Sequence, residues 1–163
     1  MPPPVKKKNM KVLMVCLGNI CRSPMAEGIL RNKVQGLGME VMTDSAGTSD
    51  YHVGEPPDRR ATATMAGHGI DISDLRARRF TSADFQRFDQ LFGMDADNLR
   101  DMLRMAPDPA AARKARSILD LVPAYPLRSV PDPYYGGEEG FEEVYRMLDQ
   151  ACDAFITTIR GPH

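Results

Sequence analysis

The sequence predicts a single-domain α/β fold, in which a doubly wound sheet of about four parallel strands is flanked by helices. Three observations lead to this class. The 163 residues match the usual length of one domain and suffice to bury a core without disulfides or metals. Short apolar runs alternate along the chain with longer amphipathic stretches. Apolar residues make up 42% and charged residues 26% of the chain, which is close to the globular average.

Four short apolar segments are the candidate strands. Residues 11–16 (K-V-L-M-V-C) form a nearly unbroken apolar run before a glycine-containing turn, as expected for a strand buried on both faces. The others follow at residues 40–44, 90–94 and 118–122. Their alternation with helices predicts a right-handed parallel arrangement, with any functional site beyond the carboxyl ends of the strands. Cys16 stands at such an end.

The first helix is expected over residues 25–35. Ser23 and Pro24 can serve as its N-cap and first residue, and Gly36 and Gly38 close it. The stretch between these signals is amphipathic. The first strand, this helix and the second strand therefore make one βαβ unit with a loop at residues 17–22.

Further helices are expected over residues 59–66 and 81–89 and from Asp95 onward. In the last helix, apolar residues recur at helical spacing from residue 141 to 159, so this helix should pack against the sheet. The prolines around residues 107–109 indicate a loop within the domain.

The composition excludes several classes of function. A net charge of -1 provides no basic face for nucleic acid. Residues 1–10 have the features of neither a signal peptide nor a membrane anchor, so we expect a flexible tail before a domain over 11–160. Three cysteines without a secretory signal favour a reducing cytoplasm over a disulfide framework. The histidines are scattered along the sequence and form no metal-binding motif, so we expect no metal or cofactor. We also expect a monomer that binds no membrane.

The segment C-L-G-N-I-C-R-S, residues 16–23, has the composition of an anion-binding loop. A loop from a strand end into a helix N-terminus directs backbone N–H groups inward and adds the positive end of the helix dipole. Gly18 and Asn19 are residue types that readily adopt the left-handed backbone angles of such a curl. Arg22 can hold two phosphate oxygens with its planar guanidinium. Together these groups favour the nucleophilic thiolate form of Cys16.

Transfer of a phosphoryl group to sulfur needs an acid for the leaving oxygen and then a base for the attacking water, and one carboxyl can serve as both. The candidate is Asp132 in V-P-D-P-Y-Y-G, where the flanking prolines restrict the backbone. A simple proline-flanked turn is the alternative interpretation. The spacing of Cys16 and Arg22 is weak by itself, but its setting between a strand and a helix favours catalysis.

Longer motifs resemble a known family. V-C-L-G-N-I-C-R-S-P-M-A-E near the N-terminus and D-P-Y-Y-G near the C-terminus are similar to motifs of the low-molecular-weight protein tyrosine phosphatases. D-S-A-G-T-S, H-G-I and G-M-D with N-L-R-D also resemble that family in order and spacing, so the likeness spans about residues 11–160. It implies hydrolysis of phosphotyrosine in proteins, and of aryl phosphates, through a phosphocysteine intermediate.

The resemblance also assigns roles to residues. Cys16 matches the nucleophile, Arg22 the phosphate-binding arginine and Asp132 the general acid and base. The amide cradle corresponds to Leu17, Gly18, Asn19, Ile20 and Cys21. The residues that hold the loop by hydrogen bonds correspond to Asn19, Ser23 and Ser45, and Ser23 is also placed to assist the leaving thiolate. The wall of the slot for the substrate ring corresponds to Tyr51, Tyr134 and Tyr135.

Five positions carry further expectations. Tyr134 and Tyr135 resemble positions that kinases can phosphorylate. Cys21 matches a second loop cysteine that forms a reversible disulfide with the nucleophile in relatives, and an inert neighbour is the equal alternative. Cys152, on the apolar stripe of the last helix, is expected to be a core thiol. Leu75 stands where many relatives carry a histidine that braces the loop, so one bracing contact is missing here.

Three other functions fit parts of the pattern. Thiol-based arsenate reductases resemble this fold and loop but need further resolving cysteines, and residues 77–94 supply none. Protein-arginine phosphatases of the same family tend to have threonine where Ile20 stands and lack the paired tyrosines. A non-catalytic phosphotyrosine-binding scaffold would keep the loop, but the presence of both Cys16 and Asp132 argues against it.

Overall fold

The structure, a computed structural model, describes residues 9–160. Most of the predicted tail over 1–10 therefore lies outside the described residues, and Met10 is already the first residue of a strand. Among the helices of residues 9–160, none combines the length and apolar character needed to cross a bilayer.

A parallel four-stranded sheet forms the centre of the molecule, with the strand order β2-β1-β3-β4. The strands are β1 (Met10–Cys16), β2 (Val41–Gly47), β3 (Gln90–Gly93) and β4 (Ala115–Ser117). The chain adds β2 on one side of β1 and then crosses over to place β3 on the other. The predicted doubly wound parallel sheet is thus confirmed, and its strand order reverses beside β1, where ligands bind in such folds.

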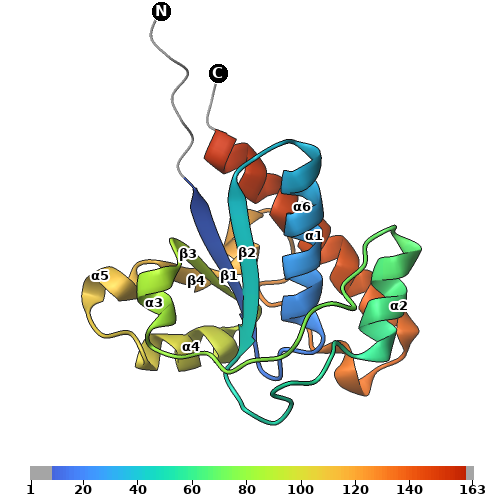
Figure 1. The fold of residues 1–163 in the computed structure, drawn as a ribbon, viewed down its shortest axis with the longest axis horizontal. Coiled ribbons are helices and arrows are strands. Elements are labelled where there is room, and N and C mark those ends of the chain that lie inside the picture. Colours follow the sequence, from blue (N-terminus) through green and yellow to red (C-terminus); the bar gives the residue numbers. More distant parts are fainter. Residues whose placement is uncertain (1–8, 161–163) are drawn as a thin grey trace, which may run out of the picture.

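Helices cover both faces of the sheet (Figure 1). They are α1 (Arg22–Gly36), α2 (Arg59–Gly67), α3 (Asp84–Arg87), α4 (Ala96–Arg104), α5 (Pro109–Ala112) and α6 (Glu138–Arg160). The first, second and last lie on one side, and α3, α4 and α5 lie on the other. Two 3-10 turns, η1 (Ile118–Leu121) and η2 (Pro133–Tyr135), complete the set.

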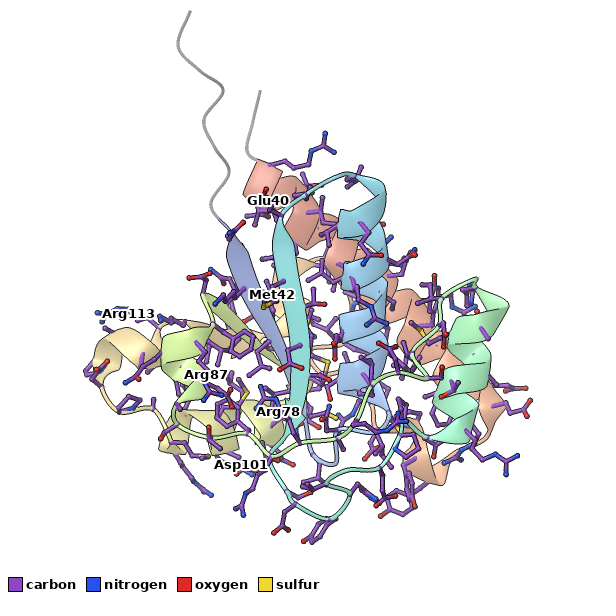
Figure 2. The ribbon with its side chains drawn as sticks, in the orientation of Figure 1. Glu40, Met42, Arg78, Arg87, Asp101 and Arg113 are labelled. Carbon is purple, nitrogen blue, oxygen red and sulfur yellow. The ribbon has the colours of Figure 1, made fainter. Side chains whose placement is uncertain are left out.

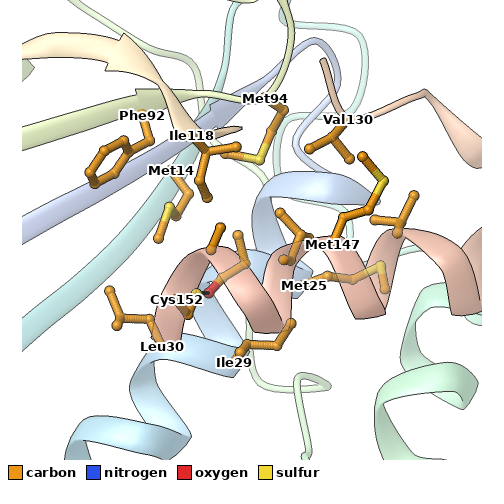
Figure 3. Close-up of a cluster of buried hydrophobic side chains, with 14 of the residues drawn as sticks. Met14, Met25, Ile29, Leu30, Phe92, Met94, Ile118, Val130, Met147 and Cys152 are labelled. Atoms are coloured by element: carbon orange, nitrogen blue, oxygen red, sulfur yellow. Dashed lines mark hydrogen bonds between the residues drawn. The ribbon is translucent and has the colours of Figure 1, made fainter. Parts of the chain in front are cut away.

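The central strand β1 supplies both halves of the core because its side chains alternate between the two faces. Val12, Met14 and Cys16 belong to the cluster under α1 and α6, and Leu13 and Val15 belong to the cluster on the other face. Figure 3 shows the larger cluster, in which methionines from strand, loop and helix fill the space around Cys152. All five of these β1 residues are at most 2% exposed, as the unbroken apolar run predicted.

The predicted strand over residues 118–122 is wrong. The fourth strand ends at Ser117, and the following residues form the turn η1. Ile118 and Leu119 are fully buried in the core that α6 covers. A short apolar run predicts burial but does not distinguish a strand from a helical turn.

The predicted helix over residues 81–89 is reduced to the four residues of α3. The carboxylate of Asp84 is fully buried and accepts hydrogen bonds from the Thr81 amide, at 2.8 Å, and from the Arg78 guanidinium, at 3.0 Å. This arrangement fixes the residues before Asp84 as a turn. The predicted proline loop also contains a short helix, α5, with Asp108 as N-cap and Pro109 in its first turn.

Candidate active site

The segment after β1 curls into a loop around the Cys16 sulfur, which lies at the carboxyl edge of the sheet. Asn19 has a φ of 58°, so it adopts the left-handed conformation that the sequence predicted for this loop. Its backbone N–H donates to the Cys16 Sγ at 3.3 Å. The Ser23 hydroxyl lies 2.9 Å from the same sulfur. Donors of the loop and of the first turn of α1 therefore converge on the predicted nucleophile.

A buried hydrogen-bond network holds this loop in place. The Asn19 side-chain amide donates to the hydroxyls of Ser23, at 2.8 Å, and Ser45, at 2.9 Å, and its carbonyl accepts from the Arg78 backbone at 3.0 Å. Because the Ser23 oxygen accepts from Asn19, its own proton is free to point at the Cys16 sulfur. All three residues predicted to hold the loop thus belong to one network.

Ser23 is not the N-cap of the first helix, contrary to the sequence-based expectation. The helix begins two residues earlier than expected, at Arg22 and not at Pro24, and Cys21 occupies the cap position without a side-chain hydrogen bond to the helix. The hydroxyl that would cap the helix is directed to the loop instead.

Leu75, at the position where the resemblance placed a histidine, is half-buried and packs against the core. Three residues further on, the Arg78 backbone N–H donates to the Asn19 side chain and so braces the loop. Figure 2 labels Arg78 near the carboxyl end of β2, where its guanidinium pairs with Asp44 and Asp84.

Close backbone contact between the loop and β2 depends on Gly47. A Cβ at this position would lie 2.8 Å from the Leu17 carbonyl oxygen and 3.2 Å from the Asn19 nitrogen. Both are backbone atoms, so any larger residue would displace the loop. The neighbouring amides of Thr48 and Ser49 donate to the carbonyls of Cys16 and Leu17 and continue the attachment.

Glu27 belongs to the same network but escaped the sequence analysis. It accepts a hydrogen bond from the Ser45 hydroxyl at 2.7 Å and is 5% exposed. Burial raises the pKa of its carboxyl to about 7, although the hydrogen bond from Ser45 acts in the opposite direction. The available signal was its position in the stretch P-M-A-E-G-I-L, where every neighbour is apolar or small.

Arg22 is held from one side and open on the other. Its Nη1 donates to the Asp95 carboxylate at 2.6 Å and to the Val130 carbonyl at 3.0 Å. Among the buried side-chain atoms of residues 9–160, its Nε is one of two without a hydrogen-bond partner. The Nε and Nη2 edge of the guanidinium is therefore available to an oxyanion in the loop. Sequence reasoning placed Asp95 only as a helix start, since its pairing with Arg22 is a long-range contact.

The predicted acid comes from the loop before η2. The Oδ1 atom of Asp132 accepts from the Tyr134 amide at 3.0 Å, which caps the turn. Its Oδ2 atom lies 3.8 Å from the Arg22 Nη2, and the side chain is 36% exposed. One oxygen is thus fixed by its own turn while the other faces the cleft.

A single cleft brings the predicted residues together. It is lined by Cys16, Leu17, Gly18, Ile20, Cys21, Arg22, Tyr51, His52, Asp132, Tyr134 and Tyr135. All three predicted wall tyrosines are present, and Tyr134 and Tyr135 meet edge to face with ring centroids 5.0 Å apart. Asn19, Ser23 and Ser45 lie behind the cleft as buried supports. His52 also lines the cleft, and sequence reasoning missed it. Its Nδ1 atom is hydrogen-bonded to the Glu55 carboxylate at 3.0 Å.

The three cysteines are free and buried, but their surroundings differ. Burial and the nearby Asp58 carboxylate raise the pKa of the Cys21 thiol far above its ordinary range. Burial likewise raises the pKa of Cys152 to about 12, in the helix core where the sequence placed it. In contrast, Cys16 has an N–H and a hydroxyl directed at its sulfur. These contacts distinguish the sulfur of Cys16 from those of Cys21 and Cys152.

Comparisons with known proteins agree with this geometry. The family described as low molecular weight phosphotyrosine protein phosphatase matches residues 11–162. A low molecular weight protein-tyrosine-phosphatase of Streptomyces coelicolor is 44% identical, covering 92% of this chain and 93% of its own. The human low molecular weight phosphotyrosine protein phosphatase is 41% identical, with 89% and 92% covered. A crystal structure of a protein tyrosine phosphatase from Entamoeba histolytica, with Hepes in its active site, superposes with a TM-score of 0.88 at 38% identity, covering 93% of this chain and 97% of that one.

The buried Glu27 predicts a specific pH dependence of stability. In the unfolded chain its carboxyl ionises near 4.5, whereas in the folded protein it stays protonated up to about 7. The folded state then binds more protons between these values, so the stabilisation present below pH 4.5 is lost as the pH rises through about 7. The loss is roughly 3 kcal/mol of unfolding free energy. Glu27→Gln stays neutral and should flatten this dependence.

Urea unfolding over this pH range measures the effect. The control is Glu40→Gln, which changes an exposed carboxylate at the opposite end of β2 (Figure 2). Its unfolding free energy should follow the wild type at every pH. Parallel curves for the wild type and Glu27→Gln would contradict the role of this carboxyl.

Proposed function

Because the chain belongs to the low molecular weight protein tyrosine phosphatase family and is a protein tyrosine phosphatase, we propose that it hydrolyses phosphotyrosine through a covalent phosphocysteine on Cys16. The observation that carries this mechanism is the convergence on one sulfur of the Asn19 N–H and the Ser23 hydroxyl, at 3.3 and 2.9 Å. Such donors stabilise a thiolate as the attacking and as the leaving group.

The reaction runs in two balanced steps. In the first, the Cys16 sulfur bonds to phosphorus while the bond from phosphorus to the aryl oxygen breaks, and that oxygen takes a proton from Asp132. In the second, Asp132 takes a proton from water, whose oxygen bonds to phosphorus while the sulfur–phosphorus bond breaks. Phenol and inorganic phosphate leave, and the thiolate and the acid are restored.

Arg22 binds the phosphoryl group in this mechanism. Asp95 and the Val130 carbonyl fix Nη1, so the opposite edge of the guanidinium presents Nε and Nη2 together. A planar pair of donors matches two equatorial oxygens of a transferring phosphoryl group. The loop amides complete the cradle. The N-terminus of α1, which is the positive end of the helix dipole, also faces the anion.

The cleft wall supports an aryl substrate. Tyr51 is 75% exposed and Tyr135 is 90% exposed, so both rings stand out from the surface beside the cleft and offer flat faces. Ile20 is apolar, lines the same cleft and has no group to bind a guanidinium. These features favour phosphotyrosine over phosphoarginine.

We also propose that the enzyme works as a cytoplasmic monomer on phosphotyrosine-containing proteins, away from nucleic acid and membranes. The net charge of -1 argues against nucleic acid as a partner, and the three free cysteines suit a reducing compartment. Inorganic phosphate and other oxyanions should bind in the loop as product and inhibitors.

Hydrolysis of an aryl phosphate in excess chelator tests the proposal. Turnover should persist without free metal, because no step uses a metal. Vanadate should block turnover, because it is an oxyanion that binds in the loop. Cys16→Ser should lower kcat by on the order of 10⁴-fold or more, as loss of a nucleophile does. Cys152→Ala, which removes a buried thiol outside the cleft, should keep near wild-type kcat. Full activity of Cys16→Ser, or loss of turnover in chelator, would exclude the mechanism.

The role of Asp132 predicts a dependence on the leaving group. Asp132→Asn should slow substrates with basic leaving groups by roughly 10²-fold to 10⁴-fold, because an alkoxide or phenoxide of high pKa needs the proton most. Activated phenols, which leave without help, should lose much less. A series of aryl phosphates measured for kcat/KM at one pH, which reports the first step and not the shared hydrolysis of the phosphocysteine, resolves the two cases. Equal losses along the series would remove Asp132 from the acid role.

A further inference from the structure

Arg60 does not line the cleft, but it contacts the loop that bears Asp132. This residue stands in the first turn of α2. Its Nη2 donates to the Tyr134 carbonyl at 2.9 Å, and its Nη1 donates to the Gly136 carbonyl at 3.1 Å. The guanidinium also packs over the rings of Tyr134, at 5.5 Å, and Phe141, at 4.7 Å. One side chain therefore holds both the backbone and a ring of this loop.

The same guanidinium is fixed on its other side by Asp58. Arg60 Nε and Nη2 lie 3.1 Å from the two carboxylate oxygens of Asp58, and the Arg60 amide donates to the same carboxylate at 2.8 Å. Burial acts to raise the pKa of Asp58, but the hydrogen bonds from Arg60 outweigh it and hold that pKa below its usual range. The carboxylate thus stays charged and the pair stays closed.

Asp58 in turn is attached to the loop around the nucleophile. Its backbone N–H donates to the Ile20 carbonyl at 2.8 Å. A continuous path therefore runs from the Ile20 carbonyl through Asp58 and Arg60 to the carbonyls of Tyr134 and Gly136. The two halves of the cleft are thus linked by residues that do not line it.

The loop that bears Asp132 has few other attachments. Between Pro123 and Gly137, only Val130 and Pro133 are buried. Val130 is fixed by its amide, which donates to the Met94 carbonyl, and by its carbonyl, which accepts from Arg22. These contacts lie on the N-terminal side of Asp132, and those of Arg60 lie on its C-terminal side. Since Asp132 itself accepts from the Tyr134 amide, fixing Tyr134 fixes the acid.

We propose that Arg60 is a positioning residue that holds Asp132 and Tyr134 over the cradle. Through Asp58, it also fixes their position relative to the loop around Cys16. The inference rests on the proposed function, because it assigns Arg60 a part in the acid step. Arg60 acts through Asp132 and touches neither the substrate nor the phosphoryl group.

The first test is Arg60→Lys. Lysine keeps the charge, but its single ammonium cannot hold the two oxygens of Asp58 and two carbonyls together. A displacement of the acid by about 1 Å is expected to lower kcat/KM, which reports the first step, by on the order of 10²-fold for substrates with basic leaving groups. Activated aryl phosphates should lose only a few-fold. Arg59→Lys, at the exposed neighbouring position, is the matched control and should behave as the wild type for both substrates.

A double variant separates positioning from a general structural role. If Arg60 acts through Asp132, adding Arg60→Lys to Asp132→Asn should slow basic leaving groups no further than Asp132→Asn alone. Multiplying losses would overturn the inference. Vanadate affinity within about three-fold of the wild type shows that the cradle of each variant is intact. If Arg60→Lys does not fold, Asp58→Asn, which keeps the cap but weakens the pair, is compared in the same way with the same expected pattern.

The outcomes also distinguish this inference from the proposed function. If Asp132→Asn slows substrates with basic and with activated leaving groups equally, Asp132 is not the acid and the proposed mechanism is rejected. In the other case, Asp132→Asn slows basic leaving groups selectively while Arg60→Lys depends on the leaving group as the wild type does. That result would reject the positioning role of Arg60 and leave the proposed mechanism intact.

Discussion

The structure depends on one turn, the left-handed backbone of Asn19. With a φ of 58°, this residue reverses the chain within the loop so that its N–H points at the Cys16 sulfur. Most residues with a side chain avoid this conformation, but asparagine adopts it more readily because its short polar side chain can form local hydrogen bonds. Here the Asn19 side chain supplies the fixing contacts, since its amide and carbonyl groups bind Ser23, Ser45 and the Arg78 backbone.

The parallel sheet brings the remaining groups to this turn. The carboxyl ends of β1 and β2 place Cys16 beside Gly47, where a missing Cβ lets the loop approach the next strand. The end of β3 supplies Asp95, which fixes one edge of Arg22. The acid arrives last, from the segment before α6, and is held to the rest by Arg22 and by the Asp58–Arg60 pair. The rigid sheet and the buried network therefore preorganise the site before any substrate binds.

Sequence reasoning recovered what local patterns determine. It found the strands with continuous apolar runs, the long amphipathic α6, and the loop residues whose types carry the chemistry. It failed where contacts outside the local pattern decide the outcome: the run at Ile118 is buried as a 3-10 turn, and the first helix begins at Arg22, so Ser23 is not its N-cap. Glu27, Asp95 and Arg60 were missed as site residues for the same reason, because each acts on a partner far away in the sequence.

Direct detection of the covalent intermediate tests the central claim that the thiolate of Cys16 attacks phosphorus. The Asp132→Asn variant, mixed with an activated aryl phosphate and quenched in acid, should accumulate a phosphoenzyme because water attack then lacks its base. Digestion and mass spectrometry should locate the added phosphoryl group on the peptide that contains Cys16, and on its sulfur. Burst release of phenol without any phosphoryl group on that sulfur would contradict the mechanism.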